Sequence, residues 1–444
     1  MIQLDSVLEP IENHNSSESE IIGFSEEDRP LTVTYYGRNT KSSLRVFIIV
    51  GQHGDERYGR KAIDRFTNMT DGKLDFPLMQ FAILSNANPD GASLRKRENV
   101  HGVDLNRDHQ LLDSKENRSV HSFVRRWNPH MIIDVHNYPS RRKHLLEKDI
   151  MLYYDVLVDV PTNPAACCIK EQSKAEFIKN ICSDLKSHNI SCERYFIVKP
   201  SGRVRHGSPD IVDARNSLSL RYNTLTFLVE GRTPTRGEDK FYREHLVSSL
   251  CEAIVSILRW AQTQRSSLME NQNSIPKKGD NVAISSRYVS ATQPFKISFK
   301  NLQTRKMGAI SIVKYTPSIK ITRYVTLPTS YAIPSDKTRV IEILHRHGFM
   351  SALSDSHKFE NIQYYSIQSV KYSTHENRAP RKIIMLPNSE QRRLDKFFIF
   401  PTSQRGGHSL AVFLEPDSKY GLHRYADLDL PIIPDSDYPI LRVM

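Results

Sequence analysis

The sequence has few cysteines and no long apolar run, and each shortage excludes a class of protein. Five of the 444 residues are cysteines, and none has Cys-x-x-Cys spacing, so neither a disulfide framework nor a thiolate metal site is expected. No run of eighteen apolar residues occurs, so no membrane-spanning helix is expected. The first residues, Met-Ile-Gln-Leu-Asp, lack the basic and apolar regions of a secretory signal. We therefore expect a globular, cytoplasmic protein.

Charge is unevenly distributed along a chain whose formal net charge is +12. Residues 1–30 contain eight acidic residues and one basic residue, which predicts a loose acidic arm. Residues 281–335 contain eight Lys or Arg and no acidic residue. We interpret this stretch as a solvated face of a small domain; the alternative is a contact surface for an acidic polymer, a membrane surface or nucleic acid.

Between residues 31 and 265 the pattern alternates between buried strands and amphipathic helices. Arg45–Val50 is a continuous apolar run, and apolar residues in Arg57–Met69 recur at helical spacing. Further strands are expected at 81–84, 131–135 and 224–229, and further helices at 177–185 and 246–261. This alternation predicts an α/β fold whose mixed, mainly parallel sheet carries helices on both faces.

The remaining sequence predicts a second, smaller domain. Residues 266–280 are rich in polar residues, Pro and Gly and are expected to form a linker. Residues 281–444 then contain short runs typical of strands, with one helix expected near 336–347. The expected strands lie at 295–299, 310–314, 383–386, 397–400 and 410–414.

Polar residues follow two of the buried strands at their carboxyl ends. His53 and Glu56 come just after the first strand, and His136 ends the strand at 131–135. Two imidazoles and one carboxylate with a fourth position open form the usual ligand set of a catalytic zinc ion. His-x-x-Glu alone is a weak signal, and helix-start polar residues are its ordinary explanation.

The surrounding motifs make this signal specific. Asn88-Pro89-Asp90-Gly91 follows another strand, and the chain then reads Arg97-Glu98-Asn99-Val100-His101-Gly102-Val103-Asp104-Leu105-Asn106-Arg107. This pattern, RxNxxGVDLNR, resembles the zinc carboxypeptidase family of carboxypeptidase A-like metallopeptidases over roughly residues 45–235. The short spacing between the motifs resembles that of compact bacterial and archaeal members. The C-terminal patterns Leu414-Glu415-Pro416-Asp417-Ser418 and Tyr438-Pro439-Ile440-Leu441-Arg442 also resemble the tails of bacterial members that carry an extra domain.

The resemblance implies a role for each matching residue. It implies that His53, Glu56 and His136 ligate one zinc ion and that Asp104 orients His53. Arg97 would polarise the scissile carbonyl and stabilise the oxyanion. The residues expected to bind the peptide substrate are Asn106 and Arg107, which would hold its terminal carboxylate, and Tyr138, which would line the cleft.

A general base is expected at the end of another apolar strand. Glu230 closes Thr224-Leu225-Thr226-Phe227-Leu228-Val229, and family members carry their catalytic glutamate in this context. A carboxylate ending a buried strand is costly unless it is paired or functional. The resemblance implies that Glu230 takes a proton from a zinc-activated water and returns it to the leaving amine, so that the C-terminal peptide bond is hydrolysed.

One position departs from the family pattern, and another predicts a substrate preference. Ser208 occupies the position of the substrate-capping tyrosine, and neither His206 nor Tyr222 is assigned as its substitute. Arg215 falls near the family position at the floor of the pocket for the terminal side chain. A cation there would favour substrates ending in Asp, Glu or another carboxylate-bearing residue, the alternatives being a structural arginine or a second carboxylate clamp.

Two other functions compete with a peptidase. One is a zinc-dependent deacylase of N-acyl amino acids, resembling aspartoacylase and succinylglutamate desuccinylase, which share His-x-x-Glu and a later histidine. The motif at 88–91 and the intact strand before Glu230 favour the peptidase. The other is a degenerate peptidase that acts as a binding module through its basic C-terminal domain, which the complete set of ligands, Arg97 and Glu230 argues against.

Overall fold

The computed structural model describes residues 18–444 apart from several short stretches, which are 38–39, 71–75, 142, 167–170, 236, 272–273, 355–356, 373–379 and 395. The first seventeen residues of the expected acidic arm lie outside this part of the chain. The later part of that arm is not loose, because Ser19–Phe24 forms strand β1 and pairs with β2, Pro30–Gly37. None of the helices in the described ranges is long and apolar enough to cross a membrane.

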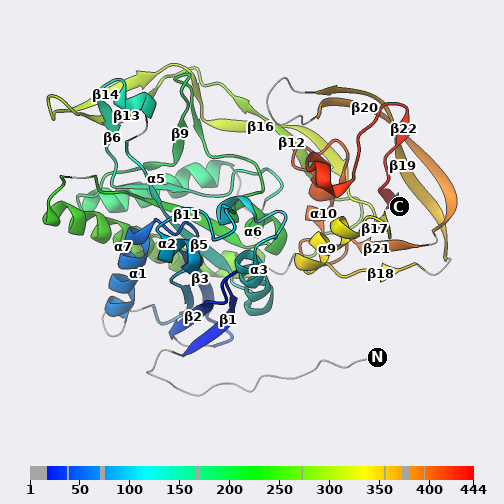
Figure 1. Ribbon diagram of the computed structural model, residues 1–444, viewed down its shortest axis with the longest axis horizontal. Helices are drawn as coiled ribbons and strands as arrows, with labels where there is room; N and C mark the ends of the chain where they lie inside the picture. Colours follow the sequence, from blue (N-terminus) through cyan, green and yellow to red (C-terminus); the bar gives the residue numbers. More distant parts are fainter. Residues whose placement is uncertain are drawn as a thin grey trace.

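The first part of the chain folds around an eight-stranded mixed sheet, as the alternation predicted (Figure 1). Its four central strands, β4, β3, β5 and β11, run parallel to one another. Antiparallel pairs join them to β2 on one side and to β7 on the other. The sheet order is β1, β2, β4 (Met79–Leu84), β3 (Leu44–Val50), β5 (Met131–Tyr138), β11 (Leu225–Arg232), β7 (Val156–Asp159) and β8 (Cys192–Arg194).

Alternate residues of each strand pack against helices on opposite faces of this sheet. In β3, Val46, Ile48 and Val50 join a core cluster with residues of α1, α5 and α7. Phe47 and Ile49 join a second cluster with α3 and α6. The helices of the first face are α1 (Arg57–Thr70), α5 (Glu171–Ser187), α7 (Lys240–Thr263) and α8 (Arg265–Asn271); those of the second are α3 (Lys115–Trp127) and α6 (Ala214–Tyr222). The fold class expected from the sequence is confirmed.

Three small sheets connect this part to the C-terminal residues. The strands β6 (Ile150–Leu152), β13 (Phe295–Asn301) and β14 (Met307–Ile312) form one of them. A second consists of β9 (Phe196–Val198), β10 (Val204–His206) and β15 (Tyr315–Thr316), and a third of β12 (Asn281–Val289) and β16 (Ser318–Thr326). The expected boundary at 266–280 therefore does not separate two self-contained units, since strands from both sides of it pair with each other. Part of the expected linker is helix α8.

The C-terminal residues form a seven-stranded sheet that lies beside the first part (Figure 1). Leu410–Leu414, expected as a strand, belongs instead to helix α10, His408–Leu414. Its residues are buried all round, and such a short apolar run carries no periodicity that distinguishes a buried helix from a strand. The other elements are β17 (Ser330–Pro334), β18 (Ala352–Leu353), β19 (His357–Tyr372), β20 (Pro380–Leu394), β21 (Phe397–Pro401), β22 (Ser436–Asp437), β23 (Leu441–Val443) and α9 (Thr338–Arg346).

Apolar and polar contacts join the two parts. Ile211 and Leu220 of the first part belong to the same core cluster as residues 282–440 of the second. Arg424 binds both carboxylate oxygens of Asp210 at 3.0 and 2.9 Å. His347, which follows α9, is fully buried and donates from Nε2 to the carbonyl of Gln110 at 2.9 Å. The two parts therefore share one continuous folded core.

We expect acidification to destabilise the protein through His347. Burial lowers the pKa of His347 to about 3. Below about pH 6.5 the unfolded chain takes up a proton at this ring that the folded protein does not. Stability that is present above pH 6.5 is therefore lost as the pH falls toward the folded-state pKa. Between pH 7 and pH 5 the free energy of unfolding should fall by about 2 kcal/mol on account of this residue.

The matched variant for this prediction is His347→Gln, which keeps a side-chain N–H toward Gln110 and cannot titrate. Urea denaturation of both proteins at pH 7 and pH 5 measures the difference. Wild type should lose about 2 kcal/mol more than the variant over this interval. An equal loss in the two proteins would show that His347 does not carry this pH dependence.

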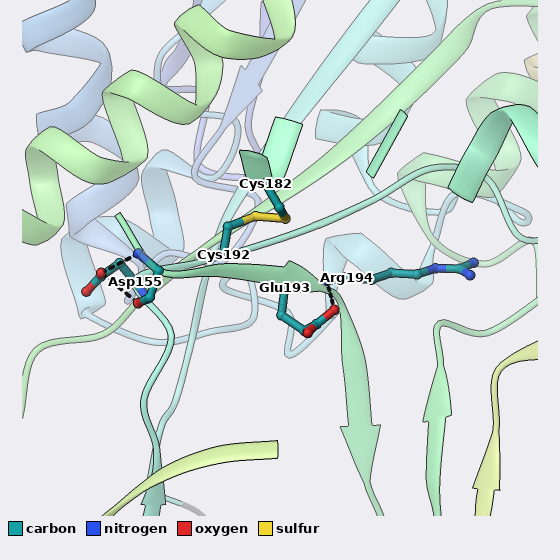
Figure 2. The surroundings of a disulfide bond; sticks show 6 residues. Asp155, Cys182, Cys192, Glu193 and Arg194 are labelled. Atoms are coloured by element: carbon teal, nitrogen blue, oxygen red, sulfur yellow. Dashed lines mark hydrogen bonds between the residues drawn. A yellow bond between two sulfur atoms is a disulfide. The ribbon is translucent and has the colours of Figure 1, made fainter. Parts of the chain in front are cut away.

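One disulfide joins α5 to β8, although the cysteine spacing gave no sign of it (Figure 2). Cys182 lies in α5 and Cys192 begins β8, ten residues later, with their Cα atoms 5.1 Å apart. The chain turns back after the helix and so brings the two thiols together, a geometry that spacing rules for Cys-x-x-Cys motifs do not detect. Cysteine usage consequently no longer supports the expectation of a reducing cytoplasm.

Candidate metal centre and active site

The candidate centre lies at the carboxyl ends of the parallel strands. His53 follows β3, Glu56 immediately precedes α1, and His136 lies near the end of β5. The turn between β3 and α1 fits closely against α2 (Pro89–Leu94), because a Cβ at Gly54 would lie 2.0 Å from the carbonyl carbon of Gly91. Glycine at this position lets the turn bring His53 and Glu56 toward β5.

The ligating atoms of the three residues converge on one point. Nδ1 of His53 lies 2.6 Å from Oε1 of Glu56 and 3.1 Å from Nδ1 of His136. Nδ1 of His136 lies 3.0 Å from the other carboxylate oxygen of Glu56. The three form a buried group whose ligand atoms all lie within 4.8 Å of one another. Two imidazole nitrogens and a carboxylate in this arrangement fit a zinc ion.

Each histidine has a carboxylate at its outer nitrogen. Nε2 of His53 lies 3.2 Å from Oδ1 of Asp104, and Nε2 of His136 lies 3.0 Å from Oδ1 of Asp134. Such partners fix the tautomer of a metal-binding histidine, leaving the Nδ1 lone pair directed inward. Burial opposes the charged form of both rings, but the carboxylates outweigh it and raise the pKa of His53 and, strongly, of His136.

Arg97 lies directly beside the three ligating residues. Its Nε donates to Oδ2 of Asp104 at 2.9 Å, and its Nη1 lies 3.3 Å from Nδ1 of His53. The side chain is 39 % exposed, so the guanidinium is held at the centre while one side stays open to solvent. A cation fixed there can stabilise negative charge that develops on a substrate oxygen.

The DLNR part of the motif forms a short 3-10 helix, η1, Leu105–Arg107. Asn106 is buried, and its amide nitrogen lies 3.2 Å from Nε2 of His136 while its oxygen accepts from the backbone of Ala214 at 2.9 Å. Arg107 is exposed and donates to the carbonyl of Asn106 at 2.6 Å. The structure thus places Asn106 against a metal ligand, and only Arg107 extends to the surface.

Glu230 lies next to the metal ligands in the sheet. In the parallel pairing of β5 and β11 its register partner is His136. Burial raises the pKa of Glu230 to about 7; the nearby Glu56 carboxylate adds to this rise, and His136 opposes it. A carboxyl group with a pKa near the working pH can both accept and return a proton.

Two expected substrate-binding residues are placed differently. Tyr138 is 2 % exposed and its hydroxyl donates to the carbonyl of Tyr154, so it packs in the core and does not line a cleft. Arg215 is also 2 % exposed and binds Oδ2 of Asp159 at 2.7 Å, with Asp213 at 3.4 Å. Its charge is already paired within the chain, contrary to the expectation of a cation facing a substrate carboxylate.

Asp134 and Gln52 are contacts of the site that sequence reasoning missed. Asp134 precedes His136 by two residues in β5, and residues two apart in a strand point to the same face. This periodicity could have identified it. Gln52 donates from Nε2 to Asp134 at 2.6 Å, and nothing in the sequence marks it apart from its position before His53.

A second group of ligand-type residues lies on the surface between α5 and α7. It consists of Asp184, His188 and Glu252. Arg259 lies 3.4 Å from Asp184 and 2.7 Å from Glu252. Arg259 therefore neutralises part of their negative charge without a metal ion.

Comparison with known proteins gives relatives along nearly the whole chain. Carboxypeptidase 2 of Trichophyton tonsurans is 23 % identical over 457 aligned residues, which cover 94 % of this chain and 81 % of the relative. Carboxypeptidase 2 of Trichophyton equinum is 22 % identical with the same coverage. No family model matches the sequence.

Two solved structures of metallo-carboxypeptidases match just over half of this chain. A metallo-carboxypeptidase from Burkholderia cenocepacia has 18 % identity and a TM-score of 0.41, over 55 % of this chain and 65 % of its own. One from Pseudomonas aeruginosa has 16 % identity and a TM-score of 0.43, over 56 % and 65 %. The matched part is thus just under two thirds of each of those chains. The likeness to carboxypeptidase 2 agrees with the resemblance of the RxNxxGVDLNR motif and of the His53, Glu56 and His136 group to the zinc carboxypeptidase A-like family.

Proposed function

We propose that this protein is a zinc-dependent metallocarboxypeptidase that hydrolyses the C-terminal peptide bond of peptides. The observation that carries the proposal is the convergence of His53, Glu56 and His136, with Arg97 and Glu230 beside them. A zinc ion held by these three residues would lower the pKa of a bound water and polarise the scissile carbonyl. The protein's own side chains carry out the remaining steps.

Glu230 is the proposed general base and acid. Its carboxylate accepts a proton from the attacking water and then delivers that proton to the nitrogen of the leaving amine. The raised pKa of about 7 suits both transfers, because a weaker base would not accept the proton and a stronger one would not return it. Arg97 stabilises the oxyanion that forms when the carbonyl carbon becomes tetrahedral.

Arg107 is the proposed recognition group for the free carboxylate at the end of the substrate. It is the exposed residue of η1, and a guanidinium binds a carboxylate through two parallel hydrogen bonds. Asn106 is buried against His136 and accepts a hydrogen bond from the backbone of Ala214, so its proposed role shifts from gripping the substrate to packing against the metal ligand. Recognition of the free carboxylate by Arg107 would make the reaction specific for the last peptide bond.

The decisive experiment compares two peptides that differ only at their C-terminus. Zinc-loaded protein is incubated with a peptide ending in a free carboxylate and with the same peptide ending in an amide, and released amino acids are measured. Release of single residues from the free-carboxylate peptide alone would support the proposal. Hydrolysis of N-acyl amino acids with neither peptide cleaved would replace it with the deacylase.

We expect Arg107→Met to weaken substrate binding selectively. A hydrogen bond between charged groups contributes about 1.5–3 kcal/mol, so KM for a free-carboxylate peptide should rise about 10- to 100-fold. Zinc affinity should stay unchanged, because Arg107 contacts none of the three ligating side chains in the described hydrogen bonds. Arg243→Met, on the exposed surface of α7, is the matched control. Equal KM values for the two variants would remove Arg107 from carboxylate recognition.

The basic stretch at 281–335 has no demonstrated ligand. Its charges are spread over β12, β13, β16 and the turns after β13 and β14, and Arg323 is paired with Asp417. We propose contact with an acidic polymer as a secondary property of this surface. Retention on heparin that disappears at moderate salt would support it.

A further inference from the structure

A line of buried polar side chains leads from His136 away from the metal centre. After Asp134 it runs through Gln52, His109 and His121 to Tyr222. These four are 2 %, 1 %, 0 % and 1 % exposed, respectively. They come from the end of β3, the loop after η1, α3 and α6. The line therefore crosses from the ligand-bearing strands to the helices on one face of the sheet.

Every link in this line is within hydrogen-bond distance. Gln52 Nε2 lies 2.6 Å from Asp134 Oδ1, and Gln52 Oε1 lies 2.7 Å from His109 Nε2. His109 Nδ1 then lies 3.1 Å from His121 Nε2, and His121 Nδ1 lies 3.1 Å from the hydroxyl of Tyr222. The line of hydrogen-bonded side chains is thus continuous from the metal ligand His136 to α6.

The chemistry of its members allows only one direction of donation. With Nδ1 of His136 facing the metal position, its Nε2 carries the hydrogen and donates to Asp134. Because a carboxylate only accepts, Gln52 must present its N–H₂ to Asp134 and its oxygen to His109. His109 therefore donates from Nε2 and accepts at Nδ1.

The same reasoning continues to the end of the line. Since His109 accepts at Nδ1, His121 must donate from Nε2 and keep its lone pair at Nδ1. The hydroxyl of Tyr222 ends the line: it lies 3.1 Å from this Nδ1 and 3.2 Å from the backbone carbonyl of His121, and both atoms accept hydrogen bonds. Burial lowers the pKa of His109 to about 4 and that of His121 well below its ordinary value, which keeps both rings neutral. Reversing any one ring would bring two donors or two acceptors together elsewhere.

We propose that Gln52, His109, His121 and Tyr222 form a one-directional hydrogen-bond chain that positions His136 for metal binding. The inference rests on the proposed metal site, and its members are positioning residues that do not touch substrate. The hydrogen-bond chain holds the Asp134 carboxylate in one position and orientation, and Asp134 in turn fixes the orientation of the His136 ring. Loss of such outer partners typically lowers metal affinity about 10- to 100-fold.

The test uses two substitutions at His109 in the full-length protein. His109→Met removes the donor to Gln52 with a side chain of moderate size. His109→Gln keeps an N–H near the position of Nε2. The dissociation constant for zinc is measured by competition with a chelator, and urea denaturation checks that each variant folds. We expect His109→Met to raise the zinc dissociation constant about 10- to 100-fold and His109→Gln to restore most of the loss.

The matched control is His130, another buried histidine. It lies just before β5, at the opposite end of the strand from His136, and its Nδ1 accepts from the backbone of Arg45 at 2.9 Å. His130→Met should lower stability without changing zinc affinity. Equal zinc affinities for wild type and a folded His109→Met would contradict the positioning role of the hydrogen-bond chain, while the proposed metal site would stand. Failure of wild type to bind zinc would overturn both.

Nitrogen NMR of the zinc-loaded wild type gives a second test that needs no variant. Both His109 and His121 should be neutral, with hydrogen on Nε2 and a lone pair on Nδ1. A ring with hydrogen on Nδ1 at either position would break the direction of the chain and overturn the inference. This reading also separates a positioning role from simple packing, which does not require a particular tautomer.

Discussion

Glu230→Gln is expected to lower kcat by about 10² to 10⁴-fold while zinc remains bound. The amide has nearly the size and shape of the carboxyl group but cannot accept a proton from water. The residue ends an otherwise apolar strand beside His136, and burial already disfavours its charge. Removing the charge should therefore leave the fold intact or slightly stabilise it, so that the loss is confined to the chemical step.

Measurement of kcat, KM and zinc content together decides this prediction. KM should change little, because the proposed carboxylate recognition belongs to Arg107. Glu244→Gln, an exposed glutamate of α7 that pairs with Arg65, is the control and should retain wild-type rates. A Glu230→Gln protein with full zinc content and wild-type kcat would show that another group moves the proton.

Arg97→Met should lower kcat by about 10² to 10³-fold, the usual loss when one oxyanion donor is removed. The guanidinium lies 3.3 Å from a nitrogen of His53 and is oriented by Asp104. Its charge counts most when the carbonyl oxygen becomes negative, so the effect belongs to the transition state and KM should rise less than kcat falls. Steady-state kinetics on a free-carboxylate peptide measure this difference.

A variant that keeps the charge separates this role from support of the metal site. Arg97→Lys should recover part of kcat, since an ammonium supplies charge without the planar geometry of a guanidinium. Arg97 also holds Asp104, so zinc affinity must be determined for both variants. A drop in activity that follows only from lost zinc would assign Arg97 to metal support and remove it from oxyanion stabilisation.

The central sheet and the metal ligands could be predicted because they depend on local patterns. Apolar runs such as Arg45–Val50 are typical of strands buried on both faces, and the ends of parallel strands meet at one edge of the sheet. His53, Glu56 and His136 therefore come together in the structure as their positions indicated. The RxNxxGVDLNR pattern then placed Arg97 and Asp104 beside them.

The errors arose where the outcome depended on tertiary partners. Arg215 of α6 matched a family position, but the pairing carboxylate of Asp159 comes from strand β7 and cannot be found by counting along the sequence. The bond between Cys182 and Cys192 depends on how the chain returns after α5. The chain of His109 and His121 joins a loop and a helix, and neither histidine matches a known ligand position. Asp134 alone was within reach of simple periodicity.

The core shared across the two parts of the chain has a consequence for how the protein can be divided. Ending the chain after α8 would remove the partners of β6 and β10 and uncover Ile211 and Leu220. Unpaired strand edges beside newly exposed apolar surface promote aggregation. The α/β part therefore depends on the C-terminal part for its fold, and evolutionary gain or loss of the C-terminal part would have required compensating changes on the α/β side.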